Sequence, residues 1–227
     1  MGERLVVTSE PVREAAKILS EAIAQVDREL GFARLGIPGG SALEVLRHVP
    51  ALLPPGVWSR LRLTWVDERC VDLASDDSNR GTAYRQNILS KDNPVGRELP
   101  LWEDGDTPER AMSRFVRRFE AELSSGLDVT LLGLGPDGHI ASLFPGHPAR
   151  FSTAAIAYVK DSPKPPPERL TLTFKSLRTA RTNVLYAVSE KKRQALEQVL
   201  AGDPLAAANV LPGDLVIVTD LPLEKKR

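Results

Sequence analysis

Hydrophobic and polar residues follow two different periods along the chain, one typical of strands and the other of helices. Short apolar runs predict strands, at residues 5–7, 32–37, 61–66, 129–134, 183–188 and 215–219. Between them, apolar residues three and four positions apart predict amphipathic helices, most clearly at residues 12–30 and 108–123. This alternation predicts an α/β fold: a single domain, over residues 1–227, with a mostly parallel sheet flanked by helices on both faces.

Several segments carry weaker patterns. Residues 154–159 and 169–173 predict two further strands, and residues 174–179 predict a short helix. Residues 93–105 are rich in turn residues, so we expect irregular structure there. Residues 162–167 contain four prolines, and we expect them to form an extended surface loop.

Composition excludes several classes of protein. The 30 basic and 30 acidic residues cancel, whereas a protein that grips nucleic acid usually has a basic excess. No apolar run approaches membrane-spanning length, and the first 13 residues lack the apolar core of a signal peptide. One cysteine, Cys70, allows no internal disulfide and fits a reducing compartment. We therefore expect a soluble, cytoplasmic protein that binds neither nucleic acid nor membrane.

The most informative stretch is residues 127–146, whose sequence is LDVTLLGLGPDGHIASLFPG. It begins with an unbroken apolar run, typical of a strand buried on both faces, and then ends abruptly in glycines. Asp137, Gly138 and His139 follow. Ligands of open α/β sheets bind just beyond the carboxyl ends of the strands, so this loop places Asp137 and His139 where a substrate would lie.

Three other segments would share that edge of the sheet. A glycine turn, Gly39-Gly40-Ser41, stands between a predicted strand and a helix, which suits a phosphate. Asp67, Glu68 and Arg69 follow another strand, and Lys191-Lys192-Arg193 begin a helix where an anion would offset their charge. Taken singly, an ordinary turn or a solvated charge explains each segment at least equally well.

A dinucleotide site is the first alternative for the central loop. Residues 133–138 match G-x-G-x-x-G, and Asp161 lies near the position of a ribose-binding acid. That fingerprint requires a helix at the third glycine, but Pro145 and Pro148 would interrupt one. The pattern therefore favours a loop.

Metal and nucleophilic sites find less support. The histidines are His48, His139 and His147, without the spacing of a zinc site, and no serine stands in a G-x-S-x-G turn. Cys70 is more compatible with burial than with a nucleophilic role. We predict no metal and no cofactor. Acid–base chemistry by His139 remains, with Asp137 to orient it, and a loop histidine without function is about equally compatible with the residues alone.

Four segments together resemble one family, in the right order and over nearly the whole chain. They are Gly39-Gly-Ser41, Asp67-Glu-Arg69 followed by Ser78-Asn79, residues 133–146, and RLTLT at 169–173 with a later lysine. They resemble 6-phosphogluconolactonase, whose superfamily includes glucosamine-6-phosphate deaminase/isomerase. The resemblance implies a Rossmann-like sheet and a reaction on a six-carbon sugar phosphate without metal or cofactor.

One position separates the two activities. The deaminases read G-H-I-A-F-N-E-P-G, with a glutamate for ring opening, where this chain has Phe144 in G-H-I-A-S-L-F-P-G. The lactonase form implies hydrolysis of 6-phosphogluconolactone, the second step of the oxidative pentose phosphate pathway. The alternatives are an isomerase or deaminase of the superfamily and a non-catalytic regulator that binds sugar phosphates.

The resemblance also implies roles for residues. His139 would be the general base and acid, supported by Asp137, and Arg69 would steady the oxyanion or the carboxylate, with Asp67 also in the catalytic group. The site that binds the substrate and its phosphate would consist of Gly39, Gly40, Ser41, Arg169 and Lys192.

The chain departs from the family pattern at three points. Ala42 replaces a threonine that would offer a hydroxyl, and RLTLT has leucine at the second position, a harmless change. The choice of Lys192 over Lys191 depends on the register of the match. The oligomeric state, a monomer or small homo-oligomer, is not readable from the sequence.

Overall fold

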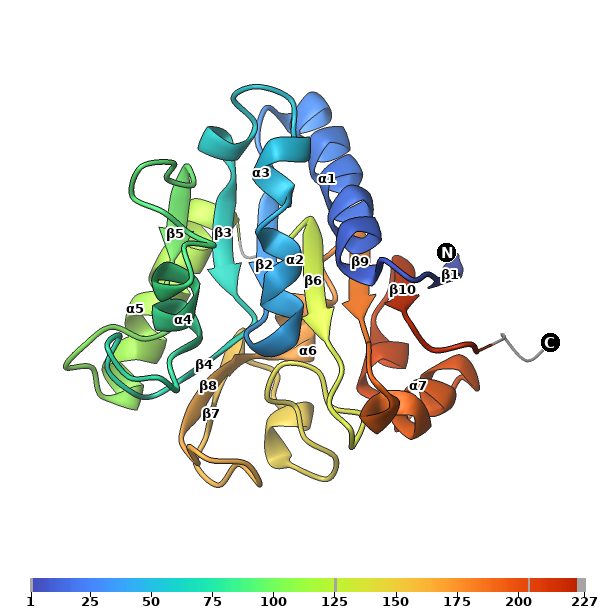
Figure 1. Cartoon of the computed structure of the whole chain (residues 1–227). Coiled ribbons are helices and arrows are strands. Elements are labelled where there is room, and N and C mark those ends of the chain that lie inside the picture. The colour runs from blue at the N-terminus through green and yellow to red at the C-terminus, as the bar shows by residue number, and fades with distance from the viewer. Residues whose placement is uncertain (1, 125, 204, 224–227) are drawn as a thin grey trace.

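The main sheet places all its strands in parallel. The computed structural model describes residues 2–124, 126–203 and 205–223. Within them, seven parallel strands have the order β1-β10-β9-β6-β2-β3-β5 (Figure 1). They span Glu3–Val7 (β1), Arg34–Ile37 (β2), Arg62–Trp65 (β3), Arg97–Leu99 (β5), Val129–Gly133 (β6), Thr182–Tyr186 (β9) and Asp214–Thr219 (β10). The predicted parallel sheet is confirmed.

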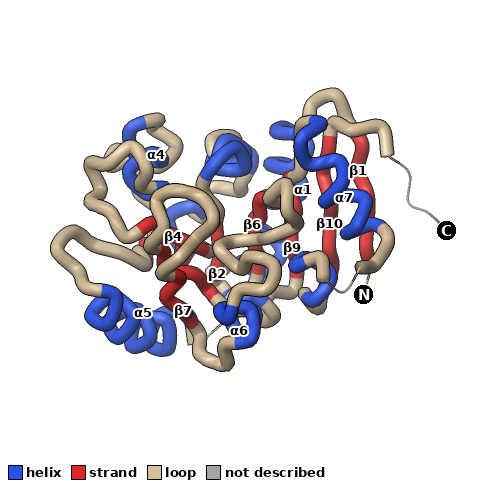
Figure 2. The backbone as a smooth tube through the Cα atoms, turned by 90° about the horizontal axis from the view of Figure 1, so that it is seen from below, coloured by secondary structure: helices blue, strands red, loops and turns tan. Residues whose placement is uncertain are grey.

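Helices cover this sheet from both sides, as the alternating pattern predicts. In Figure 2, α1 lies on one side of the sheet, and α5 and α6 lie on the other. The helices span Pro11–Leu30 (α1), Leu43–Leu46 (α2), Val49–Leu52 (α3), Asn79–Arg85 (α4), Pro108–Leu123 (α5), Phe174–Leu177 (α6) and Arg193–Leu200 (α7).

The two long helices begin and end where local chemistry dictates. Gly31 ends α1 with a left-handed φ of 79°, and its N–H donates to the Asp27 carbonyl. Thr107 caps α5 by accepting from the Arg110 N–H, and Pro108 occupies the first turn. The aromatic residues at helical spacing in α5 are buried, as expected for core packing.

A second, three-stranded antiparallel sheet lies beyond the carboxyl ends of the main strands (Figure 1). Its order is β4-β8-β7, with bounds Asp67–Arg69 (β4), Ile156–Val159 (β7) and Arg169–Leu172 (β8). The chain passes between the sheets at Val66: its N–H donates to Ile37 of the main sheet, and its carbonyl accepts from Leu172 of the small one.

Two expectations from the sequence need correction. Asp67, Glu68 and Arg69 form a strand rather than a charged turn, because β8 pairs with them. Residues 93–105 are not wholly irregular, since they contain β5 at the edge of the main sheet. A three-residue strand is too short to show a period.

A buried ion pair joins β2 to the start of β6. The Asp128 side chain is 1% exposed. It accepts from Arg34 Nη2 at 2.7 Å, from Arg34 Nε at 2.8 Å and from the Arg34 backbone N–H at 3.0 Å. These bonds tie together two central strands of the sheet.

Replacing Asp128 should therefore destabilise the fold strongly. We expect Asp128→Ala to lower the free energy of unfolding by about 3 kcal/mol or more, because it leaves the Arg34 guanidinium without its carboxylate. Urea unfolding measures the change. The control is Glu29→Ala, which breaks a half-exposed pair with Arg181 and should cost less than about 1 kcal/mol. Equal losses in the two variants would contradict the prediction.

Candidate active site

One pocket gathers nearly all the residues that the sequence singles out. It has a volume of about 310 Å³ and lies at the carboxyl edge of the main sheet. The candidates that line it are Gly39, Gly40, Ser41, Asp67, Arg69, His139, Arg169 and Lys192. They follow β2, β3, β6 and β9, which are neighbours in the sheet, or belong to the small sheet below (Figure 1). The remaining candidate, Asp137, is not among the lining residues but bonds to His139.

The Asp137–His139 pair has the geometry of an oriented base. The two side chains meet at 2.5 Å between His139 Nδ1 and Asp137 Oδ1. Burial acts to raise the pKa of Asp137, but the hydrogen bond and charge of His139 outweigh it and lower that pKa to about 2. An ionised carboxylate only accepts, so Nδ1 carries the proton. In the neutral form of the imidazole, the second ring nitrogen, Nε2, then has a free lone pair.

Glycine makes this pair sterically feasible. A Cβ on Gly135 would lie 2.1 Å from His139 Nδ1. The Gly135 N–H also donates to the His139 carbonyl, and Gly138, with a φ of 82°, turns the chain between them. Residues 136–147 form turns, so the helix that a dinucleotide fingerprint needs is not there.

The Phe144 ring packs against the imidazole of His139. Its side chain is 2% exposed, and its ring centroid lies 4.5 Å from that of His139. Its ring also lies 5.7 Å from the Arg169 guanidinium. The position that holds a glutamate in the deaminase pattern is therefore an apolar contact with the imidazole.

Asp67 connects the central loop to the small sheet. Its carboxylate accepts from Ser142 Oγ at 2.7 Å and lies 3.9 Å from Arg169 Nη1. Ser142 in turn donates its backbone N–H to Thr171 Oγ1. Both residues lie in segments that carry the family resemblance, but the sequence does not show that they meet, because these contacts join residues 75 and 29 positions apart.

Glu68 positions two residues that line the pocket. Its buried carboxylate accepts from the backbone N–H groups of Arg69, Asn79 and Arg80, at 2.8 Å each. Burial raises the pKa of Glu68 to about 7, although these three donors act to lower it. The carboxylate thereby holds the beginning of α4 against β4.

Arg69 keeps hydrogen-bonding capacity for a ligand. One N–H of its Nη1 donates to the Asp77 carbonyl, and its Nε has no acceptor among the described residues. Its side chain lines the pocket, so the guanidinium has donors left for an anion.

The glycine turn after β2 is closely packed against α4. A Cβ on Gly39 would lie 1.8 Å from Asn79 Oδ1, and Asn79 Nδ2 donates to the Asp67 carbonyl. Gly40 has a φ of 65° and starts a 3₁₀ turn, Gly40–Ala42, that leads into α2. Asn79 also lines the pocket; in the sequence it is named only as part of the Ser78-Asn79 segment that carries the family resemblance.

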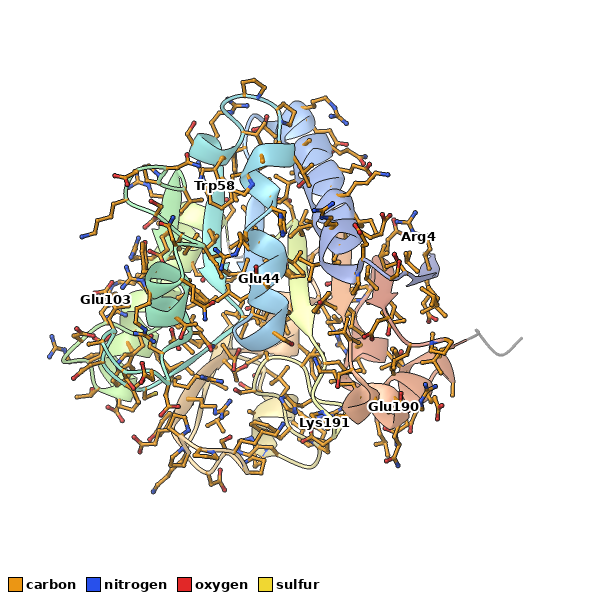
Figure 3. The ribbon with its side chains drawn as sticks, in the orientation of Figure 1. Arg4, Glu44, Trp58, Glu103, Glu190 and Lys191 are labelled. Carbon is orange, nitrogen blue, oxygen red and sulfur yellow. The ribbon has the colours of Figure 1, made fainter. Side chains whose placement is uncertain are left out.

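The two consecutive lysines before α7 differ in exposure. Lys192 lines the pocket and is half-buried, whereas Lys191 is exposed. Figure 3 shows Lys191 and Glu190 before α7, at the same edge of the molecule as the carboxyl ends of the strands. The structure also adds Lys164 to the pocket, from the proline-rich segment for which the sequence predicts a surface loop.

Other candidate chemistries find no support in the described residues. They contain no group of three or more His, Cys, Asp or Glu side chains that could hold a metal ion. Burial raises the pKa of Cys70 to about 12, with neighbouring carboxylates adding to the effect, so this thiol does not ionise at neutral pH. Among the same residues, no helix is both long and apolar enough to span a membrane.

Comparison with known proteins identifies the family. The profile described as glucosamine-6-phosphate isomerases/6-phosphogluconolactonase matches residues 8–220. The chain belongs to this family. It is 35% identical to bovine 6-phosphogluconolactonase over 213 residues, which cover 88% of this chain and 80% of the relative. It is 32% identical to the probable chloroplastic 6-phosphogluconolactonase 4 of Oryza sativa subsp. indica, over 90% of this chain and 67% of the relative.

A solved structure shares the family fold. The crystal structure of 6-phosphogluconolactonase from Thermotoga maritima superposes with a TM-score of 0.84 at 23% identity, covering 96% of this chain and 99% of that one. At that identity the match supports the fold alone.

Gly135 offers a test of the Asp137–His139 geometry. In Gly135→Ala the new Cβ should displace the imidazole and break its bond to Asp137, while the free energy of unfolding changes by about 1 kcal/mol or less, because the displaced group is a side chain. The readout is the downfield proton NMR signal of the His139 Nδ1–H at low temperature. Gly133→Ala is the control, since its Cβ would meet only Ala42 Cβ at 3.6 Å. A signal retained in Gly135→Ala would contradict this geometry.

Proposed function

We propose that the protein hydrolyses 6-phospho-D-glucono-1,5-lactone to 6-phospho-D-gluconate, the second step of the oxidative pentose phosphate pathway. The observation that carries this proposal is the oriented Asp137–His139 pair at the pocket, backed by Phe144. A base with a free Nε2 suits the activation of water. Phe144 occupies the position of the glutamate on which the deaminase pattern depends, so that carboxylate is absent here. The names of the bovine and rice relatives agree with this choice.

In the proposed reaction, His139 acts as base and then as acid. Its Nε2 takes a proton from water as the water oxygen attacks the lactone carbonyl carbon. The carbonyl becomes a tetrahedral oxyanion, and the ring C–O bond then breaks. The imidazolium returns the proton to the departing ring oxygen. Asp137 stays ionised throughout, holds the ring in place and stabilises its cationic form.

Arg69 and Asp67 serve the same reaction in different ways. The unused N–H donors of Arg69 make it our candidate for stabilising the oxyanion, where a well-aimed donor contributes about 3 kcal/mol. Asp67 is bonded to Ser142 and lies near Arg169, so we assign it a supporting role that orients these side chains.

The phosphate would bind in the same pocket as the base. We propose that the Gly39-Gly40-Ser41 turn provides backbone N–H groups for it, and that Arg169 and Lys192 provide positive charge. All five residues line the pocket, which supports this assignment. A dianion there would also offset the unfavourable interaction between the positive charge of Lys192 and the N-terminal end of the α7 helix dipole.

We further propose that residues 1–227 act as one domain, in the cytoplasm, as a monomer or a small homo-oligomer. One buried cluster includes residues from both sheets, which supports a single domain. The equal numbers of basic and acidic residues and the single cysteine support a cytoplasmic protein that does not bind nucleic acid.

Removal of the base tests the proposed function. We expect His139→Ala to lower kcat by about a hundredfold or more with the fold intact, because the attacking water loses its proton acceptor. The substrate is generated in place from glucose 6-phosphate by a dehydrogenase, and rates are corrected for spontaneous opening of the lactone. His147→Ala is the matched control, since His147 also bonds a carboxylate, that of Asp161, but does not line the pocket. If the wild type never exceeds the spontaneous rate, the proposal is wrong.

Replacement of the orienting carboxylate should have a smaller effect. Asp137→Asn keeps the size of the side chain but removes the charge that stabilises the imidazolium, so we expect kcat to fall about tenfold to a hundredfold with KM little changed. Deamination of glucosamine 6-phosphate is measured in parallel, and no activity is expected in any variant. Deaminase activity of the wild type would favour the other branch of the family.

A further inference from the structure

Arg169 uses most of its hydrogen-bonding capacity inside the protein. Its Nε donates to the Pro166 carbonyl at 3.2 Å, and its Nη2 donates to the carbonyls of Lys164 and Pro165 at 3.0 and 3.2 Å. The side chain is 5% exposed. Of the five N–H groups of a guanidinium, only the two on Nη1 remain, and these lie 3.9 Å from Asp67. Arg169 is therefore bound chiefly to its own chain.

The consequence is a fixed position for the loop that carries Lys164. Three consecutive carbonyls, at residues 164–166, are held by one buried guanidinium on β8. Pro165 and Lys164 both line the pocket. The segment that the sequence predicts to be a surface loop thus lines part of the site. Its hydrogen bonds to Arg169 hold Lys164 at the pocket.

Lys164 and Lys192 bring two positive charges to the same pocket. Neither lysine forms an ion pair within the described residues 2–124, 126–203 and 205–223. Burial lowers the pKa of Lys192, and the charge of Lys164 lowers it further, against the opposing effect of Asp220. Two cations that repel each other in a partly buried pocket are an arrangement that a bound dianion would stabilise.

We propose that Lys164 is a substrate-binding residue that shares the phosphate dianion with Lys192, and that Arg169 acts mainly as the positioning residue that holds Lys164 in place. This inference deepens the proposed function and rests on it for the identity of the substrate. Under this inference Lys164 and Lys192 contact the phosphate directly. Arg169, the most buried of the three cations, contributes mainly by holding the loop that carries Lys164.

The charge of Lys164 also reaches the catalytic pair. It is one of the smaller contributions to the lowered pKa of Asp137, after burial and the hydrogen bond and charge of His139. A role in the chemical step would therefore appear as a change in kcat, whereas a role in phosphate binding appears in KM and in the affinity for product. The two are separable by experiment.

Binding is measured first, by titration calorimetry with 6-phosphogluconate and with gluconate, which lacks the phosphate. We expect Lys164→Gln to weaken 6-phosphogluconate binding by about tenfold or more, because a charge-assisted contact is lost, and Lys164→Arg to retain most of the affinity. Lys191→Gln is the control, since Lys191 is exposed outside the pocket and should bind as the wild type does. Equal affinity of Lys164→Gln and wild type for 6-phosphogluconate would overturn the proposal.

Kinetics then separates binding from chemistry. In Lys164→Gln we expect KM for the phosphorylated lactone to rise by about tenfold, with kcat within about threefold of the wild type. A fall in kcat with unchanged KM and unchanged product affinity would overturn the binding role.

The positioning role of Arg169 is tested by a double-mutant cycle. Arg169→Lys removes the fork that holds three carbonyls, so it should weaken 6-phosphogluconate binding, and adding Lys164→Gln to it should cause little further loss. Full additivity of the two losses would refute the positioning role. If Arg169→Lys does not fold, which thermal unfolding would show, Lys164→Gln still decides the binding role of Lys164.

Failure of this inference differs from failure of the proposed function. A wild type that binds 6-phosphogluconate through Lys164 without hydrolysing the lactone would refute the proposed reaction and support the phosphate site. A wild type that hydrolyses the lactone with no dependence of KM on Lys164 would do the reverse.

Discussion

The parallel pairing of four adjacent strands is the constraint on which the site depends. Strands β9, β6, β2 and β3 lie side by side and run in the same direction. Their carboxyl ends therefore meet at one edge, although the segments that follow them are far apart in the sequence. For this reason the segments that follow the four strands converge: the glycine turn, the Asp67–Arg69 strand, the His139 loop and the Lys192 segment. The ion pair of Arg34 with Asp128, on the two central strands, supports this pairing at its other end.

The small antiparallel sheet completes what the main sheet begins. It extends from the end of β3 through Val66 and brings β8, with Arg169, beneath the pocket. Hydrogen bonds from Ser142 to Asp67 and from Ser142 to Thr171 then join this sheet to the loop that carries His139. The loop is thus held at Ser142 by two segments that are distant in the sequence.

Charge in the pocket is arranged around one imidazole and several cations. The Asp137–His139 pair is balanced, because the ionised Asp137 faces His139 directly. The cations lack such a direct partner: among the described residues neither Lys164 nor Lys192 forms an ion pair, although the charges of Asp137 and Asp220 act on them at longer range. Two cations in one pocket suit a substrate that carries a doubly charged phosphate.

The sequence by itself determined the fold class and the identity of the central loop. Apolar runs as long as β6 and amphipathic helices as long as α1 and α5 are local patterns, and local patterns are readable from a single chain. The loop around His139 was readable because its glycines, its prolines and its histidine are close together in the chain. Phe144 could be interpreted in the same way, as one position within a motif.

Only the tertiary structure decided which charged residues share the pocket. β5 and β4 are three residues each, too short for a period, and β4 exists because β8 pairs with it. The sequence did not identify Lys164 as a site residue, because its position depends on hydrogen bonds from the Arg169 guanidinium on β8 to the carbonyls of residues 164–166. The choice of Lys192 over Lys191 depends on how the turn before α7 is oriented against the pocket. Such contacts depend on the packing of distant segments, and no residue pattern within one segment encodes them.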